Sequence, residues 1–155
     1  MLGAVGMRIY LILLLLLAGC ATRHESEWHR YDAGEFSFSL PPGLKKTAAH
    51  GIDSYVSEFE SPSMELSFDY GFYSNNFQGW PDSTSYEMAT VDGRQARIGT
   101  AFGSFERGFT YHTQIYFREV RPTVHLSMVA TCKTQKDCDI AKRVFCSIAF
   151  KQEPQ

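Results

Sequence analysis

Cys20 is the residue whose chemistry its neighbours define most clearly. It closes the segment Leu17-Ala18-Gly19-Cys20, at the end of an apolar run from Ile9 to Ala18. The two small residues before Cys20 allow the chain to lie extended in a narrow peptidase cleft, and the cysteine thiolate is a nucleophile that can take up a lipid group. The spacing therefore predicts covalent modification at Cys20.

The apolar run has the layout of an export signal. A single basic residue, Arg8, precedes it, and no charge interrupts it. A membrane-spanning helix needs about 20 apolar residues, whereas roughly ten residues at about 1.5 Å each cover half of the hydrocarbon core. The run is therefore too short to span a bilayer. Met7-Arg8 is a more usual signal opening than Met1 to Gly6, so both Met1 and Met7 remain candidate starts of translation.

The segment Leu17-Ala18-Gly19-Cys20 resembles the lipobox of bacterial lipoproteins. The resemblance implies a signal peptide over residues 1–19, a thioether lipid on Cys20, cleavage just before it and acylation of the new amine. Several buried acyl chains make such an anchor effectively permanent. Ala21 resembles the residue found in lipoproteins sorted to the outer membrane, because aspartate at this position is the usual retention signal. We expect an outer-membrane protein facing the periplasm, with the outer leaflet of a single membrane as the alternative.

Three further cysteines, Cys132, Cys138 and Cys146, are expected in an oxidising compartment, where disulfides persist. Cys132 and Cys138 enclose a short polar loop between a predicted strand and a predicted helix, which favours a disulfide between them. The alternative is Cys132 to Cys146. A metal site is less favoured, because C-x5-C lacks the spacing of zinc knuckles and no histidine follows nearby. We expect no metal and no cofactor.

The rest of the chain is expected to form one domain. Without residues 1–19 the chain keeps 136 of its 155 residues, enough for one hydrophobic core. Residues 20–34 are polar and show no period, which predicts a flexible tether with Trp28 and Tyr31 docking its far end. The globular domain is expected over residues 35–151. A net charge of −2 argues against nucleic acid as a partner.

Alternating apolar residues predict strands. Phe36, Phe38 and Leu40 alternate with serines, the pattern of a half-buried strand. Similar segments pair as three hairpins: Tyr55–Glu60 with Met64–Tyr70, Tyr86–Val91 with Arg94–Thr100, and about Phe109–Arg118 with Thr123–Thr131. The expected registers place Phe59 beside Leu66, Glu60 beside Glu65, and Ile115 and Phe117 beside Met128 and Leu126. Pro122 fits a tight primed turn poorly, so its loop is expected to exceed two residues.

The period changes near the end of the chain. After Asp137 as a candidate N-cap, apolar residues recur at helical spacing at Ile140, Ala141, Val144, Phe145, Ile148 and Ala149. This predicts a C-terminal amphipathic helix that covers one face of an antiparallel sheet of hairpins. The expected fold class is therefore α+β.

Three segments together resemble the PsbP-like fold: Phe36-Ser37-Phe38-Ser39-Leu40-Pro41, the hairpin Val91-Asp92-Gly93-Arg94, and the ending Ser147-Ile148-Ala149-Phe150. The resemblance spans most of residues 35–150. Members of that group serve mainly as assembly or binding modules and have no shared catalytic centre. The resemblance therefore implies an assembly or binding module.

No arrangement of residues predicts catalysis. His112 and His125 are expected on neighbouring strands and on one face, but His125 is expected beside Arg118, so the two histidines do not make a metal pair. The chain contains no G-x-S-x-G, no H-E-x-x-H and no phosphate-binding glycine loop. The glycine-rich Gly99 to Gly108 lacks the required lysine and is expected to be a turn. We expect no catalytic residues.

Two surfaces could bind something. Glu58, Glu60, Glu65 and Asp69 form an acidic strip whose repulsion a cation such as Ca²⁺ or a basic partner could offset, although a solvated outer face is the preferred interpretation. The segment Gly71 to Pro81 holds four aromatic side chains among turn formers: Phe72, Tyr73, Phe77 and Trp80. These are candidate binding residues, and the alternative is a cover over the hydrophobic core.

These features favour a non-enzymatic, lipid-anchored binding or assembly module with a protein partner in the cell envelope. A small-ligand or ion-binding envelope protein is the second hypothesis. An envelope hydrolase ranks third among the hypotheses, since no nucleophile with its base can be identified.

Overall fold

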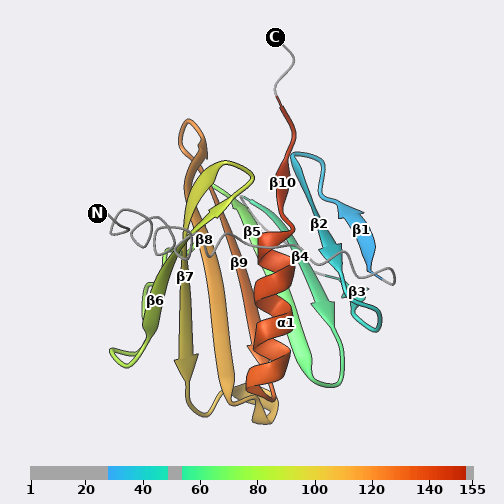
Figure 1. Ribbon diagram of the computed structural model, residues 1–155, viewed down its shortest axis with the longest axis vertical. Helices are drawn as coiled ribbons and strands as arrows, with labels where there is room; N and C mark the ends of the chain where they lie inside the picture. Colours follow the sequence, from blue (N-terminus) through green and yellow to red (C-terminus); the bar gives the residue numbers. More distant parts are fainter. Residues whose placement is uncertain (1–27, 49–53, 153–155) are drawn as a thin grey trace, which may run out of the picture.

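The computed structural model describes residues 28–48 and 54–152, and its largest element is a seven-stranded antiparallel sheet (Figure 1). Its strand order is β3-β4-β5-β9-β8-β7-β6, and a smaller antiparallel sheet has the order β1-β2-β10. Helix α1 (Gln135–Cys146) and a short 3₁₀ helix (Glu106–Gly108) complete the described elements. The strands are β1 His29–Asp32, β2 Phe36–Leu40, β3 Lys45–Thr47, β4 Tyr55–Glu60, β5 Met64–Gly71, β6 Ser85–Val91, β7 Arg94–Phe102, β8 Tyr111–Arg121, β9 Val124–Cys132 and β10 Ala149–Phe150.

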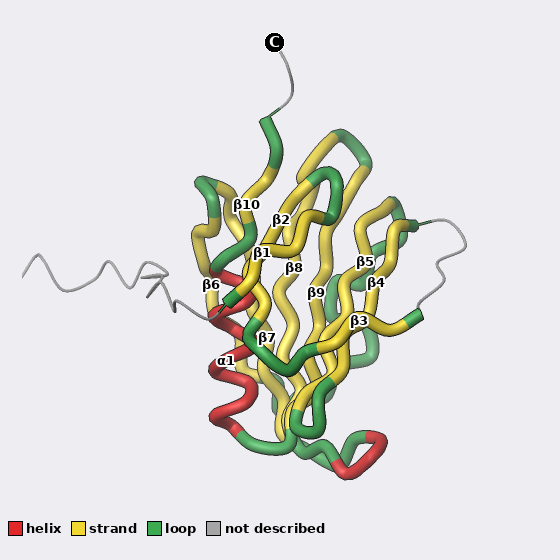
Figure 2. The backbone as a smooth tube through the Cα atoms, turned by 90° about the vertical axis from the view of Figure 1, so that its right-hand side faces the viewer, coloured by secondary structure: helices red, strands yellow, loops and turns green. Residues whose placement is uncertain are grey.

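Helix α1 and the small sheet lie on the same side of the large sheet (Figure 2), and the hydrophobic core is on this face. Successive residues of a strand point to opposite faces, so Leu66 and Phe68 of β5 are buried on this side. Helix α1 contacts β8 and β9. The small sheet covers the neighbouring area, where Phe36 meets Phe68 and Phe38 meets Phe59 in edge-to-face ring contacts. The opposite face, called the outer face below, carries the features that bear on function.

The predicted α+β class is confirmed as antiparallel sheets with one long helix in the described ranges. The predicted hairpin registers are also confirmed. Phe59 pairs with Leu66, and Ile115 pairs with Met128. Glu60 lies opposite Glu65, as expected.

The turn between β8 and β9 is shorter than predicted. Arg121 pairs with Val124, so Pro122 and Thr123 form a two-residue loop. Thr123 has a φ of 62°, as the third position of a type II turn requires, and proline suits the position before it. The twist of a type II turn does not match the right-handed twist of the two strands in a hairpin. The register of β8 shifts just before it, where Glu119 has a φ of 57°, and this irregularity accommodates the proline.

Helix α1 begins at a different cap from the one predicted. Thr134 is the N-cap, and its side chain accepts a hydrogen bond from the Asp137 N–H at 3.2 Å. The Asp137 carboxylate in turn accepts from the Thr134 N–H at 3.1 Å, which completes a capping box. Asp137 therefore occupies the third helical position, and the prediction of Asp137 as the N-cap is wrong.

No helix in residues 28–48 or 54–152 is long and apolar enough to cross a membrane.

The chain leaves the helix earlier than predicted. Helix α1 ends at Cys146, and Ala149–Phe150 form β10, which pairs with β2. Ile148 and Ala149 are therefore not helical. Ile148 is nevertheless 2% exposed and joins the core, so its spacing imitates the helical stripe that precedes it.

Part of the predicted tether belongs to the domain. His29–Asp32 form β1 and pair with β2. The Tyr31 ring lies 4.9 Å from the Phe59 ring, and its hydroxyl accepts a hydrogen bond from Lys46 Nζ at 2.8 Å. Because β1 is an edge strand with one inward side chain, its sequence shows no period. The predicted domain start at Glu35 is therefore too late.

Cys132 and Cys138 form a disulfide that joins the end of β9 to the first turn of α1. Their Cα atoms lie 5.6 Å apart, and both residues are fully buried. This is the local pairing that the sequence favoured over Cys132 to Cys146. Cys146 is not a free cysteine.

Candidate functional site

The four candidate aromatic residues lie on the segment between β5 and β6, residues 72–84, called the aromatic loop below. The structure separates them into two pairs. Phe77 is 6% exposed and Trp80 is half-buried, whereas Phe72 and Tyr73 are 56% and 76% exposed. The first pair covers part of the outer face, and the second pair projects into solvent. Phe77 and Trp80 are thus packed, but on the outer face and outside the core cluster, whereas Phe72 and Tyr73 remain the candidate binding residues.

Phe77 packs on the sheet where a glycine leaves room for it. A Cβ atom on Gly99 would lie 2.5 Å from Phe77 Cε1, closer than real Cβ contacts come. The Phe77 ring also meets the Trp80 ring at 5.2 Å and the Tyr86 ring at 5.3 Å, both edge-to-face. Gly99 of β7 therefore fixes the position of the aromatic loop.

Hydrogen bonds hold the first part of the loop, residues 74–76, on the sheet. The Ser74 hydroxyl contacts the Asp69 carbonyl at 2.8 Å and the His125 carbonyl at 3.2 Å. Gln114 Nε2 donates to the Asn75 carbonyl at 2.5 Å, and Arg97 donates to the Asn76 carbonyl at 3.2 Å. Because side chains of β7 and β8 hold its backbone and the Ser74 hydroxyl contacts β5 and β9, the start of the loop is a rigid support for the side chains it exposes.

The loop covers two polar side chains of β8. The His112 ring lies against Trp80 in a tilted contact with centroids 4.5 Å apart and meets Phe105 at 5.0 Å. His112 Nε2 and Gln114 Oε1 are both buried, and neither has a hydrogen-bond partner within residues 28–48 and 54–152. Burial lowers the pKa of His112 to about 4, so it is neutral at pH 7. The burial of Gln114 was not predicted from the sequence, because it depends on the loop folding over this residue.

Phe72 and Tyr73, called the aromatic tip below, extend from the end of β5. Their rings meet edge-to-face with centroids 4.8 Å apart. The preceding residue, Gly71, pairs with His125 of β9, so the tip lies at the end of the sheet next to β9. Two large aromatic side chains on a fixed support have the character of binding anchors, because little conformational entropy is lost when they are covered.

The acidic strip has a basic partner within the chain. Arg107, from the 3₁₀ helix, contacts Glu65 at 2.5 Å and Glu60 at 3.3 Å. This ion pairing offsets the repulsion that suggested a bound cation. No group of three or more His, Cys, Asp or Glu side chains within residues 28–48 and 54–152 is arranged to hold a metal ion.

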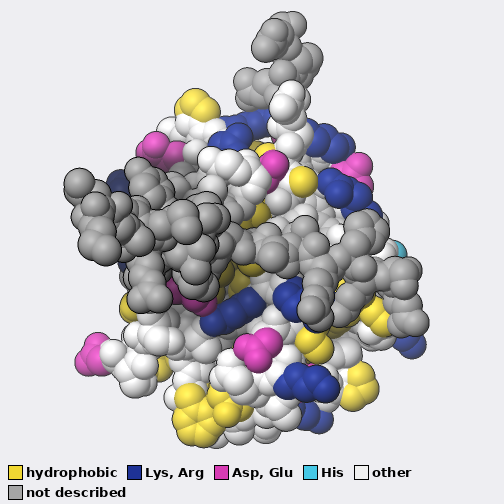
Figure 3. All heavy atoms as spheres, in the orientation of Figure 1, with side chains coloured by type: hydrophobic (Ala, Val, Ile, Leu, Met, Phe, Trp, Pro, Cys, Tyr) yellow, Lys and Arg dark blue, Asp and Glu magenta, His cyan; other side chains and the backbone are white. Residues whose placement is uncertain are grey.

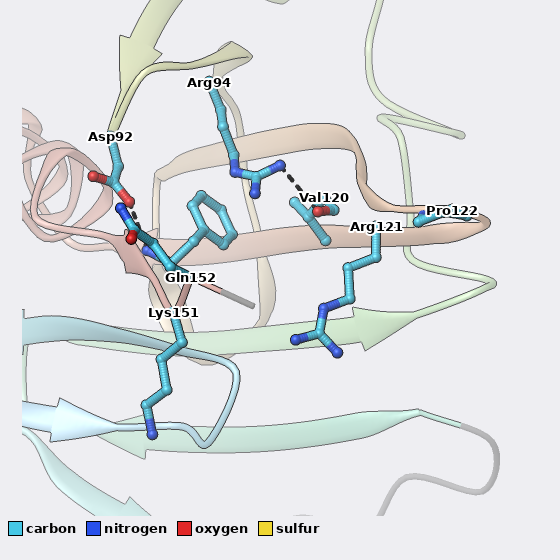
Figure 4. Close-up of a pocket in the computed structure, with 8 residues that line it drawn as sticks. Asp92, Arg94, Val120, Arg121, Pro122, Lys151 and Gln152 are labelled. Atoms are coloured by element: carbon cyan, nitrogen blue, oxygen red, sulfur yellow. Dashed lines mark hydrogen bonds between the residues drawn. The ribbon is translucent and has the colours of Figure 1, made fainter. Parts of the chain in front are cut away.

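A pocket of about 500 Å³ lies near the end of β10, and Figure 4 shows basic side chains lining it from several elements. Two of the three basic side chains are paired with carboxylates. Arg121 pairs with Glu35, and Lys151 pairs with Asp32 at 3.1 Å. Arg94 donates to the Val120 carbonyl at 2.9 Å. The pocket is therefore explained by contacts that fasten the chain end to the sheet.

His112 and His125 do not come together. His112 lies under the loop, and the His125 ring stacks on Tyr116 with centroids 5.8 Å apart.

On the visible described surface in Figure 3, basic and acidic side chains are mixed and neither sign dominates. Cys20 and the predicted signal peptide lie outside the described residues.

The sequence did not indicate a groove beside the aromatic loop. It is lined by side chains of four strands, including Arg97, Tyr116, Arg118 and His125. The one sequence feature that could have pointed to this groove is the alternation of an aromatic and a basic residue, Tyr116 and Arg118, on β8.

No protein-family model and no curated protein matches the chain. Its fold is similar to a crystal structure from Bacteroides thetaiotaomicron VPI-5482, with a TM-score of 0.54, 14% sequence identity and 83% of this chain covered. The chain spans 50% of the length of that protein. At this identity the similarity supports the fold and carries no information about function.

Proposed function

We propose that this protein is a lipid-anchored lipoprotein of the bacterial envelope whose domain binds a protein partner through the aromatic tip. The anchor rests on the segment Leu17-Ala18-Gly19-Cys20 after a short apolar run, and Ala21 favours the outer membrane, facing the periplasm. The domain serves as a binding or assembly module without catalysis. Its fold is proposed to be PsbP-like.

The observation that carries the binding role is the contrast within one loop. Phe77 and Trp80 are packed on the sheet, while Phe72 and Tyr73 a few residues away remain exposed. A loop that packs its other aromatic residues has no folding reason to expose two more. Exposed tyrosine and phenylalanine on a rigid support contribute strongly to protein interfaces, where tyrosine is enriched among the most important contacts.

Replacing Cys20 by serine tests the anchor. Serine lacks the thiolate that attacks the lipid donor, so an unprocessed and unlipidated precursor is expected. Metabolic labelling with a radioactive fatty acid should mark the wild-type protein and leave the C20S protein unlabelled. Processing and labelling that continue in C20S contradict the lipoprotein assignment.

Removing the aromatic tip tests the binding role. In-cell crosslinking of the tagged lipoprotein is expected to yield a recurrent protein adduct, and the double variant Phe72→Ser/Tyr73→Ser should reduce it at least tenfold, since interface anchors contribute about 2 kcal/mol or more each. The matched control is Phe102→Ser, which removes an aromatic side chain that is 67% exposed elsewhere. An adduct that depends equally on Phe102, or on neither site, argues against the tip.

A further inference from the structure

An open groove of about 670 Å³ lies on the outer face beside the aromatic loop. It is lined by Met88 of β6, Arg97 of β7, Tyr116 and Arg118 of β8, and His125 of β9. Its volume lies within the range of roughly 300–1,000 Å³ that small-molecule sites occupy. Neither residue of the aromatic tip lines the groove, which has different chemistry.

The groove has positive charge that nothing in its lining offsets. Arg97 and Arg118 line it, and no described carboxylate does. Among the described residues neither arginine has an acidic side chain within ion-pair distance. This differs from the pocket of Figure 4, where Arg121 and Lys151 are paired with acidic side chains. The groove is therefore suited to an anion.

Arg97 is held in place before any ligand arrives. Its guanidinium lies 4.6 Å from the centre of the Phe77 ring and 5.1 Å from that of Tyr86. It also donates to the Asn76 carbonyl at 3.2 Å. A guanidinium fixed by stacking loses little conformational entropy on binding and can still offer its other N–H groups to an oxyanion.

His125 provides a further fixed donor. Its Nδ1 accepts a hydrogen bond from the Glu119 N–H at 3.1 Å. In the neutral imidazole the proton must then be on Nε2, which becomes a hydrogen-bond donor. The irregularity of β8 that accommodates Pro122 thus also sets the tautomer of His125.

The groove also offers flat and apolar surface. The Tyr116 and His125 rings lie at an interplanar angle of 27° with centroids 5.8 Å apart. Met88 is 67% exposed, and a thioether packs well against aromatic rings. A ligand with a charged end and a planar ring would use both parts of the site.

We propose that this groove binds an organic oxyanion, a carboxylate or phosphate group attached to a flat ring. Arg97 and Arg118 contact the oxyanion, and Tyr116 and Met88 pack against the ring. The proposal is independent of the aromatic tip and of its protein partner.

Isothermal titration of the purified full-length protein in detergent micelles tests the site. The probes are phenyl phosphate and benzoate, which share a ring and differ in the oxyanion, and benzyl alcohol, which has the ring without charge. One-site binding of phenyl phosphate or benzoate is expected, with no binding of benzyl alcohol at the same concentration. Failure of both anions to bind at millimolar concentration overturns the proposal.

Variants separate a specific site from general electrostatic attraction. Arg118→Gln is expected to weaken anion binding about tenfold, since it removes a positive charge and a charge-assisted hydrogen bond. Arg97→Gln should act similarly, provided that circular dichroism shows a folded protein. Arg107→Gln changes the net charge by the same amount outside the groove and should leave binding within about twofold. Equal weakening by Arg107→Gln and Arg118→Gln overturns the site.

Discussion

Replacing Phe77 by alanine is expected to destabilise the domain by about 3 kcal/mol, the lower end of the range for buried phenylalanine. The ring is 6% exposed and meets Trp80, Tyr86 and the guanidinium of Arg97. The lower end applies because a loop can detach without complete unfolding, which limits the loss. Urea denaturation of the wild-type and F77A proteins measures the difference in the free energy of unfolding.

A double-mutant cycle with Gly99 shows whether the contact itself is responsible. Gly99→Ala should destabilise the wild type, because its Cβ atom would lie 2.5 Å from Phe77 Cε1. In the F77A protein the same change should cost clearly less, since the Phe77 ring is gone and only Tyr86 Cε1, 3.1 Å from the added Cβ atom, must still give way. Strictly additive effects would show that Phe77 does not rest on Gly99 in solution.

Acidification is expected to destabilise the fold through His112. Burial lowers its pKa from 6.5 to about 4, while the unfolded chain keeps a value near 6.5. Between these values the unfolded state binds the proton more readily. The contribution of neutral His112 to the stability of the fold is therefore complete above pH 6.5 and is lost progressively as the pH falls to 4. The loss amounts to about 3 kcal/mol in all.

The variant His112→Phe isolates this effect, because phenylalanine can pack between Trp80 and Phe105 but cannot take up a proton. Carboxyl groups titrate in the same range and contribute to both proteins, so the quantity to compare is the change in unfolding free energy between pH 7 and pH 4. Wild type should lose about 3 kcal/mol more than H112F. Equal losses in the two proteins would show that His112 is readily protonated in the folded state.

Local signals predicted most of the sheet. Asp92-Gly93 between two alternating segments defines a hairpin because few residues tolerate positive φ at both central positions, and here φ is 49° and 74°. Strand β1 was missed because one inward residue, Tyr31, gives no period. Strand β10 was assigned to the helix because Ile148 is buried at a helical spacing. Short edge elements take their structure from the strand they pair with, and their own sequence says little.

The outer face could not be predicted in the same way. The groove joins β6 to β9, so its residues meet only once the registers of three strand pairs are known. Likewise, Phe77 and Tyr73 look equivalent in the sequence, and what separates them is whether a ring fits the space above Gly99. The backbone of Phe77 has a φ of 74°, a conformation that sequence patterns rarely anticipate for an aromatic residue.

The central claim is that the aromatic tip contacts a protein partner in the envelope. The most direct test places a photocrosslinking amino acid at position 73 in the full-length protein, with position 102 as the control, and irradiates living cells. We predict a discrete adduct of one partner protein from position 73 and none from position 102. No adduct from position 73, or the same adducts from both positions, would contradict the proposed role of the tip.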